Sequence, residues 1–190
     1  MRKRNVYALF SATLLLSLSG CAAADAVGRE PEDTVLAQII GVDVDGRGVS
    51  VTAAGQDGEK TVVAAASGDT LESAFAALPT AGEKYISLTN VTHILVGDGV
   101  DVIGLLNYVV SDPDMSYMAK VWSAGYAGGL MEDLREGGLG RFQLLEQGET
   151  VTVKAALAEL LSGNPAAVPA LAPGAYGPET VGKLYFEVSG

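Results

Sequence analysis

The sequence predicts an α/β (α+β) fold, a mixed β-sheet that opens with an antiparallel hairpin and has helices packed on it. Strand-like and helix-like segments alternate along most of the chain, as they do in a sheet covered by helices. Near the start of this alternation, two apolar, β-branched runs over residues 35–44 and 49–53 flank the turn-forming residues 45–48. That arrangement is typical of a β-hairpin, so the sheet is expected to begin there.

The next segments extend the sheet and add a first helix. A third strand is expected over residues 61–65, after a turn at 56–59. Asp69 can cap the free N–H groups of a helix start while Glu72 reaches back, which is a capping-box arrangement. Apolar residues then recur at helical spacing over 71–78 until Pro79, which predicts a helix that ends at this proline.

The middle of the chain predicts a buried strand followed by a second helix. Residues 91–96 are apolar on both faces apart from Thr92 and His93, as in a central strand covered on both sides. Asp98 is the expected cap of the following helix, which ends before Asp112. The elements expected after it are a strand over 117–124, a short helix over 128–135, an amphipathic helix over 153–161 and a final strand over 184–188.

Four of the seven prolines lie between residues 165 and 178. This density predicts an extended connector before the last strand, because a proline-rich segment favours the open polyproline conformation over a compact element.

The N-terminus has the three parts of a secretory signal peptide. A basic start at residues 2–4 precedes an apolar run over 6–18, followed by small residues and one cysteine. The apolar run of about 13 residues is too short to span a membrane. Residues 18–21 resemble the bacterial lipobox, in which the cysteine thiolate forms a thioether to a diacylglycerol. We therefore expect residues 1–20 to be removed and Cys21 to carry the lipid; the alternative is an ordinary secreted protein with a stray cysteine.

Behind the lipid, residues 21–34 are small, acidic and interrupted by Pro31, which predicts a flexible tether. Residues 35–190 then form one domain. Removing residues 1–20 takes three of the 12 basic residues and none of the 23 acidic ones, so the formal net charge becomes −14. A chain this acidic is a poor partner for nucleic acid or anionic headgroups. Cys21 is the one cysteine, so neither a disulfide nor a cysteine-based metal site is expected.

No residue pattern indicates a reaction, and we expect no catalytic, metal or cofactor site. His93 is the single histidine, and a lone histidine in a strand is usually a packing residue. Residues 43–48 faintly resemble a calcium loop but lack the later oxygen ligands, so a hairpin turn is favoured. Residues 97–99 follow a strand as phosphate-binding loops do, but they lack the loop lysine and are interpreted as a capped turn. Three aromatic residues are candidates for a pocket or for the core: Tyr117, Trp122 and Tyr126.

Taken in order, the motifs resemble the N-terminal domain of the Ger(x)C family, the lipoprotein C subunits of nutrient germinant receptors in endospore-forming bacteria. The motifs are the lipobox, IIGVDVDGRGVSVTA (39–53), SGDTLESAFAAL (67–78), YISLTNVTHILVGDGVD (85–101), VIGLLNYVV (102–110) and the Asp-Pro-Asp turn (112–114). The sequence departs from the family pattern at Asn90, where the family often has His, and at Ser111, where it often has Arg. Family members usually continue through two further domains.

The resemblance implies a non-enzymatic, lipid-anchored subunit. Such a subunit acts in spore germination by assembling with membrane-embedded A- and B-type partner subunits on the outer face of the cytoplasmic (spore inner) membrane. Cys21 is the one residue to which a family role transfers, because the family's C subunit has no catalytic residues to carry over. The alternative is an envelope lipoprotein that binds a small solute for a transporter.

Overall fold

The computed structural model describes residues 33–46, 48–137, 139–145, 148–175 and 177–187. The chain divides into two units at Glu32 and Asp33, and all described residues belong to the second. The expected signal peptide 1–20, the lipidated Cys21 and nearly all of the tether 21–34 lie outside the described residues. Within them, no helix is both long and apolar enough to cross a membrane.

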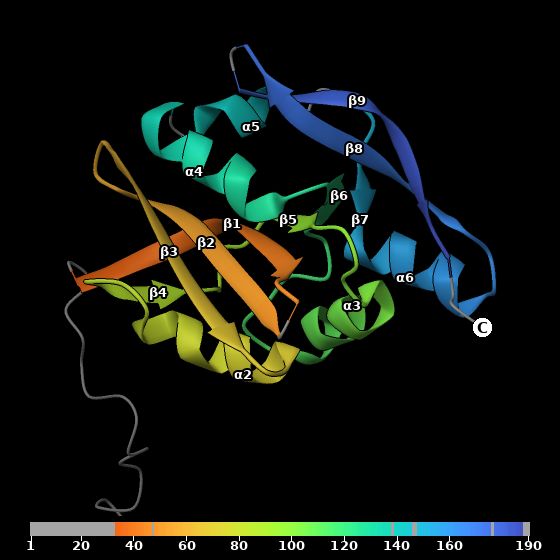
Figure 1. The fold of residues 1–190 in the computed structure, drawn as a ribbon, viewed down its shortest axis with the longest axis horizontal. Coiled ribbons are helices and arrows are strands. Elements are labelled where there is room, and N and C mark those ends of the chain that lie inside the picture. Colours follow the sequence, from red (N-terminus) through yellow and green to blue (C-terminus); the bar gives the residue numbers. More distant parts are fainter. Residues whose placement is uncertain (1–32, 47, 138, 146–147, 176, 188–190) are drawn as a thin grey trace, which may run out of the picture. The chain divides into compact units, whose positions relative to one another are not determined.

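A single mixed sheet runs through the domain in the order β3-β2-β1-β5-β6-β8-β9 (Figure 1). Strands β1, β5, β6 and β8 are parallel to one another, and β2, β3 and β9 add antiparallel pairs at the two ends. The short strands β4 and β7 pair with β1 and β6. The strands are β1 Thr34–Val44, β2 Val49–Asp57, β3 Lys60–Gly68, β4 Tyr85–Ser87, β5 His93–Val96, β6 Lys120–Ala124, β7 Val151–Thr152, β8 Ala166–Gly174 and β9 Gly177–Phe186. The predicted fold class, with its opening hairpin, is confirmed.

Helices cover both faces of this sheet (Figure 1). They are α2 Leu71–Ala77, the 3₁₀ helix η2 Leu78–Thr80, α3 Val102–Ser111, α4 Ala127–Gly137, α5 Gly140–Leu145 and α6 Val153–Leu161. Helices α2, α3 and α6 pack on one face, which we call the first face. Helices α4 and α5 pack on the second face. The strand β5 between these layers is buried at all of its four residues, as expected for a central strand.

The first face holds the larger part of the core. Phe75 of α2 stacks on Tyr108 of α3, with 4.6 Å between the ring centroids. Leu105 and Leu106 of α3 and Leu160 of α6 are buried in the same cluster. Burying side chains of this size contributes about 1.5–3 kcal/mol each, so the apolar spacing that predicted these helices also provides much of their stability.

The second face is built around the one tryptophan. Trp122 of β6 is fully buried and belongs to a cluster with Leu130 and Met131 of α4 and Phe142 of α5. Alternate residues of β1 point to this face, because side chains alternate along a strand. Ile39 packs in the cluster, Gly41 lies against α4 and Asp43 reaches the start of α4.

Two predicted helix caps are wrong by one and three residues. Helix α2 is capped by Thr70, not Asp69: the Thr70 hydroxyl accepts from the Ser73 amide, and the Ser73 side chain, not Glu72, completes the capping box. Helix α3 is capped by Asp101, which accepts from the Gly104 amide at 3.1 Å, and Asp98 lies outside the helix. Each segment contains more than one residue whose side chain could cap a helix. The residue at which the helix actually starts decides which of them becomes the cap.

The predicted proline-rich connector over 165–178 is not a connector. Within it, residues 166–174 form strand β8 and residues 177–178 begin β9, and the two strands pair antiparallel. Pro169 and Pro173 lie in the β8–β9 register, outside the two-residue stretch Ala170–Leu171 that pairs with β6. A strand tolerates proline where that position needs no N–H for the ladder, so the prolines are compatible with pairing here. The last strand is accordingly longer than predicted.

Candidate functional site

The carboxyl ends of β1, β5 and β6 meet at one place, which we call the strand-end junction. Ligands of open α/β sheets bind at this end, outside the carboxyl ends of the parallel strands, so it is the first place to search for a site. Asp43 comes from the end of β1, Gly97 directly follows β5, and Gly125 directly follows β6. The Gly97 amide donates to the Val42 carbonyl at 2.8 Å, which joins the first two segments.

Asp43 occupies the centre of the strand-end junction. Its carboxylate accepts from the amides of Ala127 and Gly128 at 2.8 and 2.7 Å, and the residue is only 7% exposed. The first N–H groups of a helix have no partner within the helix, and the helix dipole favours a negative charge there. Asp43 therefore supplies from β1 the anion that the start of α4 requires. The position at which an anionic ligand would bind is filled by the chain itself.

Glycine at positions 41 and 97 allows β1, α4 and the turn after β5 to pack closely together. A Cβ on Gly97 would overlap the Asp43 Oδ1 atom and lie 2.9 Å from the Val42 carbonyl oxygen, and a Cβ on Gly41 would lie 3.0 Å from the Ala127 Cβ. Such distances leave no room for a larger side chain at Gly97. The glycine after β5 is thus required by packing against Asp43. The turn interpretation of residues 97–99 agrees with this, although the residue that caps the helix is Asp101.

Strands β1 and β2 form a hairpin after Asp43, as favoured from the sequence. Strands β1 and β2 pair in register down to Val44 and Val49, and the Asp45 amide donates to the Gly48 carbonyl at 3.2 Å. Both Asp43 oxygens accept hydrogen bonds from the first amides of α4, so this carboxylate is directed to the helix. Across the described residues, no group of three or more His, Cys, Asp or Glu side chains is placed to hold a metal ion.

His93 is a packing residue of the second face, as expected. It is 4% exposed, and its Nδ1 accepts a hydrogen bond from the Trp122 Nε1–H at 3.1 Å. The Phe142 ring lies beside it, with centroids 5.4 Å apart. An indole N–H can only donate, so His93 Nδ1 is the acceptor in this contact.

The three candidate aromatic residues do not line a common pocket. Trp122 is in the core, whereas Tyr117 and Tyr126 are more than half exposed. The ring of Tyr126 lies over the first turn of α4, where a Cβ on Gly129 would be 2.7 Å from its Cδ1. The ring of Tyr117 lies 6.0 Å from the Lys154 Nζ.

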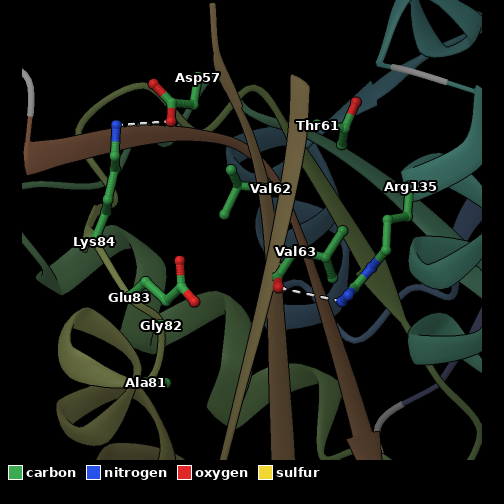
Figure 2. A pocket seen from close by; sticks show the side chains of 9 residues that line it. All are labelled: Asp57, Thr61, Val62, Val63, Ala81, Gly82, Glu83, Lys84 and Arg135. Carbon is green, nitrogen blue, oxygen red and sulfur yellow. Dashed lines mark hydrogen bonds and ion pairs between the residues drawn. The ribbon is translucent and has the colours of Figure 1, made fainter. Parts of the chain in front are cut away.

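An open groove of about 550 Å³ lies along the outer edge of β3 (Figure 2). It combines residues from distant parts of the chain: 57 and 61–63 from the β2–β3 hairpin, 81–84 from the loop before β4, and Arg135 from α4. A smaller groove of about 300 Å³ is lined by residues at the amino ends of β5 and β6, including Asn90, Met118 and Lys120. The sequence does not predict the β3 groove, because no local pattern connects residues as far apart as Val63 and Arg135, which are separated by 72 positions.

Cys21, the predicted lipidation site, lies outside the described residues. Comparison of the chain with protein-family models, with curated proteins and with solved structures finds no match.

Proposed function

We propose that this chain is a non-enzymatic, lipid-anchored subunit of a nutrient germinant receptor. It acts in spore germination by assembling with membrane-embedded A- and B-type partner subunits on the outer face of the spore inner membrane. The proposal rests on the resemblance of the ordered motifs to the Ger(x)C family. Signal coupling would then pass through protein contacts, with the lipid on Cys21 as the anchor.

The ordered set of motifs carries the proposal, and the strand-end junction adds support to it. Two of the motifs, residues 39–53 and 85–101, are far apart in the chain, yet Asp43 of the first and Gly97 of the second fit against each other there. The spacing leaves no room for a side chain at Gly97. The two motifs therefore pack together within one domain, as the proposal of a single module requires.

The proposed anchor is physically sufficient to keep the domain at the membrane. One acyl chain binds a bilayer only marginally, whereas two or more chains hold firmly. With a net charge of −14 after removal of residues 1–20, the protein gains no attraction from an anionic leaflet. Tethering raises the local concentration of the domain near its partners, so that even a weak interface is occupied.

Fractionation of dormant spores and of growing cells, with an antibody to this chain, tests the proposal. We expect the protein in the inner-membrane fraction of spores. Its presence in growing-cell membranes together with its absence from spores would contradict the proposal. The protein would then be a general envelope lipoprotein, for which solute binding is the alternative.

The anchor itself is tested by Cys21→Ala. This substitution removes the only thiol, so the variant is expected to leave the membrane fraction in detergent-free extracts. Ser67→Ala, which changes an exposed residue of the domain, is the control and should remain with the membrane. If Cys21→Ala still fractionates with membranes, lipid does not hold the protein there.

A further inference from the structure

Within the described part of the chain, strand β3 is an open edge of the sheet, because it pairs only with β2. Asp57 and Lys60 face each other across the two-residue turn Gly58–Glu59, and Gly58 has the positive φ of 61° that such a turn needs. In an antiparallel ladder, every second residue directs its N–H and C=O away from the partner strand. Counting from the turn, these outward residues are Thr61, Val63, Ala65 and Ser67.

A contact from α4 supports this register independently. The Arg135 Nη2 donates to the Val63 carbonyl at 3.3 Å, which requires that carbonyl to point away from β2. Arg135 also pairs with Glu132, with 3.3 Å between Nε and Oε2, and its side chain is 53% exposed. Charged side chains commonly protect sheet edges from unwanted pairing. Here one exposed arginine covers one carbonyl and can release it to a competing strand.

The groove described above runs beside this edge. The loop at residues 81–84 forms a wall next to β3, and a Cβ on Gly82 would lie 3.4 Å from the Ala64 Cβ. In Figure 2 this loop and the strand flank an open space into which the carboxylate of Glu83 projects. An extended chain placed there would run beside the outward N–H and C=O groups of Thr61 and Val63.

The charges of the groove favour a basic occupant. Lys84 is paired with Asp57 at 2.7 Å and Arg135 with Glu132, so both cations are already neutralised. Glu83 has no hydrogen bond or ion pair with any described residue. Among the described residues that line the groove, the one uncompensated charge is therefore negative, and the chain as a whole is acidic.

We propose that the edge of β3 binds an extended segment of a partner protein by strand addition, with a Lys or Arg of that segment facing Glu83. Strand addition draws affinity from main-chain hydrogen bonds and specificity from side chains beside the edge. Thr61 and Val63 supply the main-chain groups, and Glu83 supplies the selection for a cation. The proposal deepens the proposed function by naming a surface for assembly, and it rests on that function only for the identity of the partner.

Titration of the full chain, in detergent micelles, with two blocked heptapeptides tests the proposal. One alternates Lys and Val (KVKVKVK) and the other alternates Glu and Val (EVEVEVE). The Lys peptide is expected to bind saturably and to slow hydrogen exchange at the Thr61 and Val63 amides, while the Glu peptide binds at least tenfold more weakly. Absence of saturable binding up to about 1 mM, or binding without protection of these amides, overturns the proposal.

Matched variants locate the contact. Thr61→Pro removes an outward N–H inside the groove and Ser67→Pro removes one on the same edge outside it; neither removes a bond to β2. Thr61→Pro should abolish peptide binding and Ser67→Pro should preserve it, with urea midpoints confirming that both fold.

Glu83→Gln should weaken binding three- to fivefold, as expected for a partly exposed ion pair. Equal binding by both proline variants contradicts the proposal, and this result is independent of where the protein is found in cells.

Discussion

The two faces of the sheet hold their helices by different means. On the first face, each helix is capped by the residue just before it: Thr70 caps α2, Asp101 caps α3 and Thr152 caps α6. Each capping side chain accepts from the backbone amide three residues later. On the second face, the start of α4 is capped by Asp43, which belongs to β1. Asp43 precedes the two capped amides by 84 and 85 residues. The first three helices carry their own start signals. The first amides of α4 find their side-chain acceptor only when β1 is in place, so the stability of this helix depends on the folded sheet.

The largest expected effect is at Asp43. Asp43→Ala leaves two buried N–H groups of α4 without an acceptor, and we expect a loss of about 3 kcal/mol in the free energy of unfolding. Asp43→Asn keeps one oxygen acceptor and should lose less. Urea unfolding measures the loss, and hydrogen exchange at Ala127 and Gly128 should accelerate more than exchange in α2.

Asp98→Ala is the control for this comparison. Asp98 is an exposed carboxylate next to the strand-end junction, and its removal should change stability by no more than about 0.5 kcal/mol. Equal losses for Asp43→Ala and Asp98→Ala would show that the long-range cap does not hold α4.

A substitution at His93 tests the packing of the second face at a distance from the Asp43 cap. His93→Leu leaves the buried Trp122 N–H without its acceptor, which should cost about 2 kcal/mol. Trp122 is the only tryptophan, so its fluorescence reports this site alone, and the emission maximum should shift to the blue as the polar partner is lost. An unchanged emission spectrum together with unchanged stability would contradict the assigned contact.

The local caps of the first face should each matter less. Thr70→Ala and Thr152→Ala each remove one side-chain acceptor at a helix start, and the expected loss is about 1 kcal/mol apiece. The two caps share no partner, so the double variant should lose about the sum. Thermal or urea unfolding of the single and double variants measures this. A loss at Thr70 as large as that at Asp43 would remove the distinction between local and long-range caps.

The smallest expected change in the free energy of unfolding at neutral pH is that of Tyr108→Phe. Burial, then the nearby carboxylate of Asp112 and finally Glu72, raise the pKa of Tyr108 above its ordinary value of 10.0. A group with a raised pKa in the folded state contributes its stability fully below the unfolded pKa and loses it as pH rises through the folded pKa. Tyr108→Phe should therefore lose less stability than the wild type between pH 9 and pH 11, as measured by urea midpoints. Parallel pH profiles would contradict this.

The difference between the faces also explains what the sequence could predict. Helices α3 and α6 were predicted closely, because apolar spacing and residues able to cap lie within each segment. The sequence predicts a helix near the true position of α4, but it assigns Asp43 to a strand and hairpin turn and gives it no link to that helix. Nothing local in residues 43–48 indicates that this carboxylate caps a helix more than 80 positions later.

Strand β8 and helix α5 are not predicted from the sequence, for other physical reasons. In β8, the prolines suggested an open connector, yet tertiary pairing with β9 decided the conformation. Helix α5 has only six residues, which is too short for a periodic pattern to be distinguished from a loop. The predictions failed where contacts between distant segments outweigh local preference.

The most direct test of the proposed function is the timing of germination. Spores from which this gene is deleted are mixed with nutrients, and the fall in optical density is followed beside spores complemented with the wild-type chain or with Cys21→Ala. The account predicts a slowed response to at least one nutrient, restored by the wild-type chain and not by Cys21→Ala. An unchanged response to every nutrient tested would contradict the assignment to a germinant receptor.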